Sequence, residues 1–341
     1  MNRRITINDV AQAAGVSNAT VSYIINNKVG KTFPESTKQK VLEAAKELVY
    51  IPNMAARSLS QNSSRLIGVV VPQTEPGSRL MFQNSFYSEI LGSIEYHSRL
   101  NGYHIIISAT DANEGYLKLA KERNLDGIII IGMYPDAFYQ QMKTSQIPIV
   151  LIDSYCNDHY FHNVRIDDAY GSYLATKHVI ECGHRDISFF CGRIKENGVM
   201  KKRLAGYKNA LGEAGLPFST DYVFEGNIDY DSGIVSVNKL LDKKSPVTAI
   251  VAAADILAIG AMKGLYERGA RIPDDISVMG FDDLEIAQYL TPGLSTIKQQ
   301  ISQKGETAIQ LLMNHIADNC VTKQECVLPV KLIERGSVKK V

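Results

Sequence analysis

The sequence lacks the long apolar run that a membrane-spanning helix needs. Its longest apolar segments, such as 66–71 and 127–131, have the length of strands and fall well short of the ~20 residues required. The first twelve residues, MNRRITINDVAQ, include no apolar stretch of the kind found in secretory signals. The five cysteines are odd in number and form no CxxC pair, which favours reduced thiols. We therefore expect a cytoplasmic protein with no membrane partner.

The motifs of the commonest catalytic and metal sites are also missing. No GxSxG, GxGxxG or GxxxxGK[ST] occurs. His159 and His162 form an HxxH in a polar stretch, but the helical metal motif has a longer spacing. The adjacent acids at 167–168 and 282–283 are expected to point apart, which disfavours a shared acid–base role. The sequence predicts no enzyme, no cofactor and no metal site.

Charge is unevenly distributed, although the whole chain carries a net charge of only +1. Residues 1–65 hold nine Lys or Arg against four Asp or Glu, a net charge of +5, which leaves −4 for the remainder. A basic N-terminal part on a faintly acidic body indicates a polyanionic partner for that part. A solvated basic face would give the same count, so the charge needs support from a motif.

Three helices are expected within the first 51 residues. A capping box begins at Thr6, and apolar side chains then follow at helical spacing as far as Gly15, a suitable C-cap. Ser17 is placed to cap a second helix, NATVSYIIN, and a third is expected over about 35–48. A helix, a short glycine-containing turn and another helix are typical of the helix-turn-helix motif.

The second of these helices has an uncharged polar face. Apolar Val21, Ile24 and Ile25 fall on one side of it. The other side holds small or hydrogen-bonding residues: Asn18, Ala19, Ser22, Tyr23 and Asn26. A solvated face normally carries Lys and Glu, whereas a helix in the major groove of DNA needs amides for base edges and small residues for close approach. We predict binding to double-stranded DNA; a small protein-binding domain is the alternative.

These segments resemble the LacI/GalR family of bacterial transcription repressors. The likeness is carried by IxDVAxxAGVSxxTVSxxxN over Ile7–Asn26 and by VYIPNxxARSL over Val49–Leu59. The resemblance implies that some residues of the second helix read bases while others hold the DNA backbone. The contacts expected in this domain, residues 1–51, are Thr6, Ser17, Asn18, Ala19, Thr20, Ser22, Tyr23 and Asn26.

Residues 52–65 are expected to form a hinge helix and linker. The segment NMAARSLS favours a helix but is too short to be stable alone. The resemblance implies that it orders on binding DNA, packs against the same segment of a second subunit, and inserts Leu59 into the minor groove. An ordinary linker is the alternative. The hinge contacts that follow from the resemblance are Asn53, Ala56, Arg57 and Leu59.

Beyond the linker, apolar runs of strand length alternate with helix-length segments. The runs are 66–71, 103–108, 126–131, 148–152, 187–190, 248–253 and 276–281. The runs lack strict polar alternation, which is typical of parallel strands that helices cover on both faces. We expect an α/β body with two lobes and a ligand in the cleft between them. The resemblance implies a core like that of periplasmic sugar-binding proteins, used for effector binding and dimerisation. Its lobes would span roughly 66–164 with 294–322, and 165–293 with 323–341.

The resemblance also implies the lining of an effector pocket. The residues that match the family's pocket-lining positions are Phe86, Tyr87, Asp153, Arg203, Ile228, Ala254, Asp282 and Gln299. Ala254 stands where many sugar-binding members have Asn, and Ile228 stands where an aromatic ring is common. A sugar is the expected effector, while a purine-type ligand or a phosphocarrier protein remains an alternative.

Together these features predict a homodimeric repressor that binds a pseudo-palindromic operator under the control of a small molecule. Two other classes fit the body: a sugar-processing enzyme with an added DNA-binding domain, and a transport-type binding module. The missing catalytic motifs disfavour the first, and the missing secretory signal disfavours the second. No heptad repeat follows residue 330, so no tetramerising coiled coil is expected.

Overall fold

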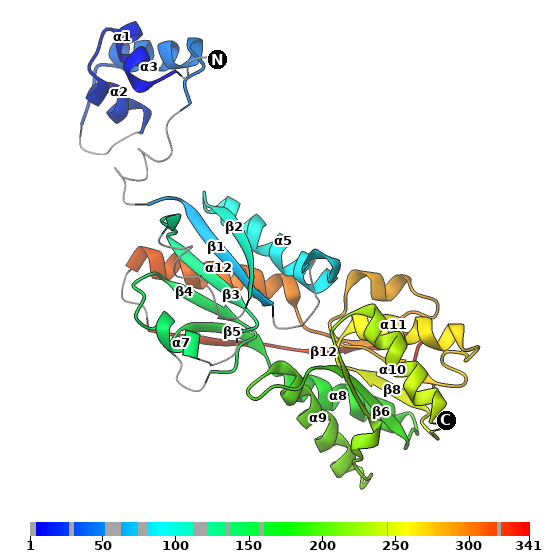
Figure 1. Ribbon diagram of the computed structural model, residues 1–341. Coiled ribbons are helices and arrows are strands. Elements are labelled where there is room, and N and C mark those ends of the chain that lie inside the picture. The colour runs from blue at the N-terminus through cyan, green and yellow to red at the C-terminus, as the bar shows by residue number, and fades with distance from the viewer. Residues whose placement is uncertain are drawn as a thin grey trace. The chain divides into compact units, whose positions relative to one another are not determined.

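The computed structural model describes residues 5–26, 31–51, 63–73, 81–111, 122–133, 137–156, 160–243, 245–318 and 322–341. The chain divides into two compact units, Met1–Ser64 and Arg65–Val341 (Figure 1). We call them the head and the body. No helix within the described ranges is long and apolar enough to cross a bilayer.

The head contains three helices: α1 (Ile7–Ala14), α2 (Asn18–Ile25) and α3 (Glu35–Glu47). Thr6 caps α1 by donating its backbone N–H to the Asp9 carboxylate at 2.8 Å. Gly15 ends α1 in the left-handed region (φ 66°), which a glycine adopts without strain. Val10, Val21 and Val41, one from each helix, are fully buried against one another. The predicted helices are thus present.

The body begins with a six-stranded parallel sheet in the order β11-β5-β4-β3-β1-β2. Its strands are β1 (Leu66–Gln73), β2 (His104–Asp111), β3 (Gly127–Ile131), β4 (Ile149–Ile152), β5 (His162–Ile166) and β11 (Glu325–Leu328). Helices α5 (Ser85–Leu100) and α12 (Ile301–Asp318) contribute to the apolar core on one face, and α7 (Ala137–Met142) to the core on the other. Because both faces are covered, successive residues such as Val69 and Val70 are both buried.

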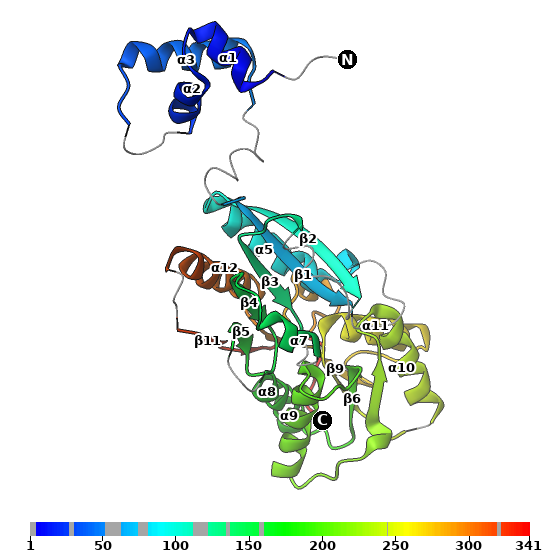
Figure 2. The same ribbon diagram turned by 60° about the vertical axis from the view of Figure 1, so that its left-hand side comes forward.

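A second lobe contains a four-stranded parallel sheet in the order β7-β6-β8-β9. The strands are β6 (Ile187–Gly192), β7 (Val223–Gly226), β8 (Ala249–Ala252) and β9 (Ser277–Met279). The helices are α8 (Asp168–Glu181), α9 (Val199–Glu213), α10 (Tyr230–Asp242) and α11 (Asp255–Glu267). The α8–α9 pair covers one face and the α10–α11 pair the other (Figure 2). Gly206 allows α9 to approach α8, because a Cβ there would lie 2.0 Å from the Ala169 carbonyl oxygen.

Three segments connect the lobes. The chain passes from β5 into α8, returns through β10 (Thr296–Lys298) into α12, and crosses again through β12 (Lys331–Ile333), which pairs antiparallel with β10. Short 3₁₀ helices lie at Met81–Gln83, Thr220–Tyr222 and Glu285–Tyr289. The predicted division placed residues 323–341 in the second lobe, but β11 extends the first sheet by pairing with β5. Only the chain after β11 reaches the second lobe, where Val278 N–H donates to the Ser337 carbonyl at 2.8 Å.

Candidate functional site

The predicted DNA-contacting residues of the head lie on α2, at its C-cap Asn26, or just before the start of α1 or α2. Of these residues, four are exposed and four are half-buried. The exposed ones are Thr6, Ser17, Asn18 and Ala19, and the half-buried ones are Thr20, Ser22, Tyr23 and Asn26. Ser17 caps the helix by accepting a hydrogen bond from the Thr20 N–H at 3.2 Å. This places several short polar side chains along one exposed edge of the head. The eight head residues that sequence analysis singled out are thus accessible to a ligand.

The structure adds contacts to this face that the sequence did not indicate. The Lys31 ammonium lies 4.6 Å from the centre of the Tyr23 ring, and Phe33 packs beside the same ring. The Asn8 side chain accepts a hydrogen bond from Asn18. A cation on an aromatic ring and linked amides are suited to phosphate and base edges. The predicted hinge contacts, Asn53, Ala56, Arg57 and Leu59, lie outside the described residues.

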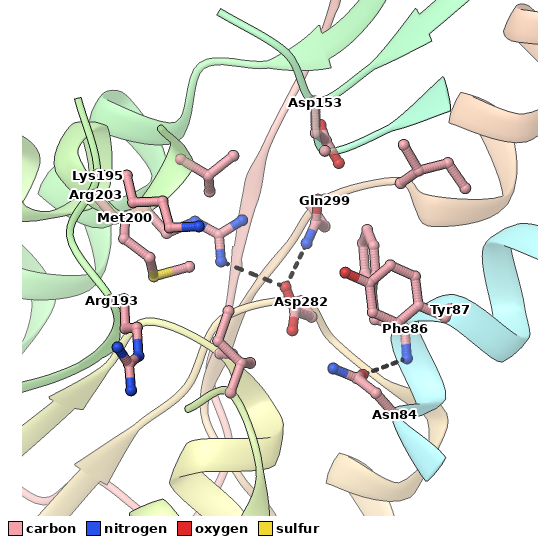
Figure 3. Close-up of a pocket in the computed structure, with 15 residues that line it drawn as sticks. Asn84, Phe86, Tyr87, Asp153, Arg193, Lys195, Met200, Arg203, Asp282 and Gln299 are labelled. Carbon is pink, nitrogen blue, oxygen red and sulfur yellow. Dashed lines mark hydrogen bonds and ion pairs between the residues drawn. The ribbon is translucent and has the colours of Figure 1, made fainter. Parts of the chain in front are cut away.

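The body contains a pocket between its two lobes (Figure 3). All eight predicted effector residues line it: Phe86, Tyr87, Asp153, Arg203, Ile228, Ala254, Asp282 and Gln299. Most of them follow the carboxyl end of a strand or stand near the start of a helix, where ligands bind in open parallel sheets. Seven further residues line the pocket without having been predicted: Asn84, Ile131, Gly132, Arg193, Lys195, Val199 and Met200.

A buried lysine forms the first-lobe side of a polar network beside this pocket. The Lys304 ammonium is fully buried and donates to both Asp153 oxygens, at 2.6 and 2.7 Å, and to the Gln299 side-chain oxygen. The Gln299 amide in turn donates to the Asp282 carboxylate. Because Asp282 belongs to the second lobe, this chain of contacts links the two lobes.

Arg203 continues the network on the second-lobe side. Its Nε donates to Asp168 at 2.8 Å, its Nη1 donates to the Ala253 carbonyl, and Nη1 also lies 3.7 Å from Asp282. The guanidinium carbon stands 3.7 Å from the centre of the Phe281 ring. Burial would lower the pKa of Arg203, but the neighbouring carboxylates raise it, so the side chain stays charged.

Two acids of the pocket have unusual backbone geometry. Asp153 and Asp282 have φ angles of 52° and 132°, in a region that ordinarily favours glycine. Each is fixed by a backbone hydrogen bond: Asp153 N–H donates to Val164 at 3.0 Å, and Asp282 N–H to Ile297 at 2.8 Å. Such strain, about 1–3 kcal/mol per residue, persists only where surrounding contacts fix the conformation. Both carboxylates are therefore held in place before a ligand arrives.

The pocket combines donors, acceptors and ring contacts in one space. Arg203 and Gln299 supply N–H donors, and Asp282 supplies an acceptor, as ligand hydroxyl groups require. Phe86 and Tyr87 pack edge to face, with ring centres 5.4 Å apart, and offer an apolar wall.

In the parts of the chain that the structure describes, no three His, Cys, Asp or Glu side chains gather as a metal site would require.

Replacing Asp282 with asparagine should flatten the pH dependence of stability. Burial raises the pKa of the Asp282 carboxyl from 3.8 to about 7. Its contribution to stability is therefore fully present below pH 3.8 and is lost as the pH rises through about 7, because the folded state holds the extra proton over that range. Urea midpoints of both proteins at intervals across this range measure the effect. If the urea midpoint changes with pH to the same extent in both proteins, the pKa of Asp282 is not raised, because the other acids are the same in the two proteins.

Two members of the network that sequence reasoning missed are Lys304 and Asp168. The signal for Lys304 was present, because α12 buries one stripe of residues: Ile301, Lys304, Gly305, Ala308, Ile309, Leu311 and Leu312. A lysine within such a stripe must find a buried counter-charge. Asp168 gave no comparable signal. It follows Asp167, which caps α8 by accepting a hydrogen bond from the Tyr170 N–H at 2.9 Å, and an acid in the first turn of a helix is common.

Comparisons with known proteins agree with this architecture. The family model for bacterial regulatory proteins of the lacI family matches residues 6–53, and the periplasmic binding protein-like domain model matches residues 176–338. The chain is 33% identical to the HTH-type transcriptional repressor PurR of Vibrio campbellii, over 98% of this chain and 99% of that protein. It is 32% identical to the ribose operon repressor of Haemophilus influenzae, over 98% of each.

Solved structures give the same result. A lac repressor dimer bound to operator and the anti-inducer ONPF has a TM-score of 0.85 at 27% identity, covering 99% of this chain and 100% of that one. A LacI family regulator from Enterococcus faecium with bound ribose has a TM-score of 0.71 at 30% identity, covering 81% and 99%. The chain belongs to the lacI family of bacterial regulatory proteins, and it is a DNA-binding transcriptional repressor and not an enzyme.

Proposed function

We propose that this repressor acts in the cytoplasm as a homodimer on a pseudo-palindromic operator, and that a sugar bound in the interlobe pocket controls it. The observation that carries the proposal is the network in which Gln299 and Arg203 both approach Asp282 from different parts of the body. A ligand that exchanges hydrogen bonds with this network would favour one lobe arrangement over another. Ribose is bound in one similar structure, which supports a sugar.

A purine-type ligand is the second candidate. Ala254 and Ile228 offer no side-chain hydrogen bond, and together with Met200 they make part of the pocket wall apolar. A planar ring would stack between such residues and the Phe86–Tyr87 pair without needing the amide that Ala254 lacks. The two candidates predict different ligands for the same pocket, so one experiment separates them.

The deciding experiment measures operator affinity at fixed salt, with and without candidate ligands. The operator is first obtained by selecting DNA from a random pool with the full-length protein. We expect a palindromic site and a change in affinity with one compound from a panel of sugars, sugar phosphates and purines. By linkage, the operator must change the affinity for that compound by the same factor. Selection of a palindrome with no response to any compound would favour a protein co-regulator instead.

Replacing Leu59 with alanine tests the proposed hinge. Loss of a large apolar side chain from a minor-groove wedge is expected to weaken operator binding by about 10- to 100-fold and to reduce DNA bending. Ser60→Ala, one position further along the same segment, is the control and should bind normally. Gel-shift titration gives the affinity, and circularly permuted operator fragments give the bend. Unchanged affinity and bending in Leu59→Ala would refute the wedge.

A further inference from the structure

One loop of the first lobe contacts two of the segments that connect the lobes. The loop follows β4 and contains both Asp153 and Tyr155. Asp153 accepts hydrogen bonds from Lys304 near the start of α12, where the chain has returned through β10. Tyr155 contacts the segment in which the chain passes from β5 into α8, which we call the first crossing. The polar network of the pocket and the first crossing are thus held from the same loop.

The Tyr155 hydroxyl contacts both ends of the first crossing. It donates to the Asp168 carboxylate at 2.6 Å and lies 3.4 Å from the Ile166 carbonyl oxygen. Ile166 is the last residue of β5 and Asp168 is the first of α8, so one hydroxyl spans the point where the chain changes lobe. Burial and the nearby Asp168 carboxylate raise the pKa of this hydroxyl, which therefore remains a donor at neutral pH. Because a hinge takes up its rotation within a few residues, a contact across those residues favours one lobe arrangement.

Asp168 connects this contact to the pocket. Its side chain is completely buried, with Tyr155 donating to Oδ2 and the Nε of Arg203 donating to Oδ1 at 2.8 Å. Arg203 lines the pocket, whereas Tyr155 is not part of the lining. Hydrogen bonds to an ionised carboxylate are short and strong, and the two donors together fix the orientation of this one. Tyr155 therefore helps to orient the guanidinium that a pocket ligand would meet.

The Tyr155 ring is held independently of its hydroxyl. The Arg165 guanidinium carbon lies 5.2 Å from the ring centre, and the Lys202 ammonium lies 5.1 Å from it. Arg165 belongs to β5 and Lys202 to α9, so both lobes contact the ring. Arg165 is itself anchored by Glu325 at 2.6 Å. A phenylalanine at this position would keep these contacts, and the hydroxyl can therefore be removed alone.

We propose that Tyr155 is a positioning residue for allosteric control: its hydroxyl holds Asp168, and through it Arg203, and so stabilises the lobe arrangement of this structure. This inference rests on the proposed function, because it describes how a ligand at Arg203 would act on the lobes. A ligand that competes for the Arg203 guanidinium would loosen Asp168, and the loosened first crossing would favour another arrangement. Operator affinity reports the arrangement, because the two binding equilibria are linked.

The test removes the hydroxyl and measures the operator affinity of the full-length protein with no ligand added. Tyr155→Phe should change operator affinity by about 3- to 30-fold at fixed salt, because a contact that stabilises one lobe arrangement is lost. Weaker binding would mean that the operator prefers the arrangement that the hydroxyl holds, and tighter binding that it prefers the other; both results support the proposal. Hydrogen exchange of backbone amides should also become faster at the starts of α8 and α9.

Tyr207→Phe is the matched control. Tyr207 is a buried tyrosine of α9 whose hydroxyl donates to the Ile187 carbonyl at 2.7 Å, and both residues belong to the second lobe. The control therefore loses a hydroxyl hydrogen bond without losing a contact at the first crossing. It should lower the urea midpoint and leave operator affinity within about twofold of that of the unmodified protein.

The outcomes separate this inference from the proposed function. The proposal would be overturned by an operator affinity of Tyr155→Phe within about twofold of that of the unmodified protein, by an equal change in Tyr207→Phe, or by unchanged exchange at the start of α8. An equal change in the control would mean that the shift follows from lost stability. These measurements use no ligand, so they do not depend on the effector. The proposed function fails separately if no compound of the panel shifts the operator affinity of the unmodified protein.

Discussion

Replacing Lys304 with alanine is expected to lower the free energy of unfolding of the body by about 3–5 kcal/mol. The Lys304 ammonium is completely buried, and it contacts both oxygens of Asp153, which is itself buried. Truncation leaves that carboxylate, which is largely buried at the edge of the pocket, without its cation. Burial raises the pKa of Asp153 even with the lysine nearby, so removal of Lys304 should raise this pKa further. Urea unfolding followed by circular dichroism measures the loss.

Two further variants show whether the loss of stability in Lys304→Ala comes from the unpaired buried charge. Lys263→Ala removes an exposed lysine that pairs with Glu267 on α11, and it should change stability by less than about 0.5 kcal/mol. Lys304→Met combined with Asp153→Asn removes both charges while keeping similar volumes, and it should recover most of the lost stability. If Lys304→Ala destabilises no more than Lys263→Ala does, the buried ion pair is not a stabilising element of the body.

Much of the fold was predictable because its strands are apolar on both faces. The runs that became β1, β2, β3, β4, β6, β8 and β9 were identified from the sequence alone. The strand β5, HNVRI, was missed because it is polar and its burial depends on partners distant in sequence. His162 accepts a hydrogen bond from the Gln324 N–H at 3.2 Å, and Asn163 donates to the Ser154 carbonyl at 2.7 Å.

The candidate pocket was predictable only where the family resemblance supplied positions. It gave Asp153 and Gln299 but not Lys304, which joins them. The stripe on α12 marks this lysine as buried, but its partner Asp153 lies 151 residues away and cannot be identified from that stripe. Arg193 and Lys195 were missed for a different reason. A charged loop after a strand is ordinarily solvated, and only the folded body shows that this loop borders the pocket.

The boundary between the lobes was misplaced for a related physical reason. The segment ECVL at β11 has only four residues, and apolar Val327 stands at an exposed position. Its sequence therefore lacks the alternation of polar and apolar residues that marks a half-buried strand. It lies at the edge of the first sheet, where Arg165 pairs with Glu325 at 2.6 Å. Strand pairing at such a position is decided by backbone hydrogen bonds to β5, which the side-chain pattern does not encode.

Replacing Arg203 with alanine is expected to abolish the response to the effector and also to destabilise the body. Sequence reasoning alone predicts a weakened response with DNA binding spared. The structure adds that Arg203 is buried beside Asp168 and Asp282, so its removal leaves the buried Asp168 carboxylate without its cation at a cost of about 3–5 kcal/mol. Tyr155 still donates to Asp168 at 2.6 Å, but a hydroxyl does not neutralise the charge.

Arg203→Lys separates the proposed binding role of this side chain from its structural role. Lysine keeps the positive charge beside Asp168 and should retain much of the stability, yet it lacks the planar fork that reaches the Ala253 carbonyl and a ligand at once. We expect calorimetry to show effector affinity reduced at least tenfold while the urea midpoint falls less than in Arg203→Ala. Lys202→Ala, on the same helix with its ammonium 5.1 Å from the centre of the Tyr155 ring, is the matched control and should retain effector binding. If Arg203→Lys binds the effector as tightly as the unmodified protein, Arg203 serves the pocket only as a charge, and the fixed geometry of the guanidinium is not what selects the ligand.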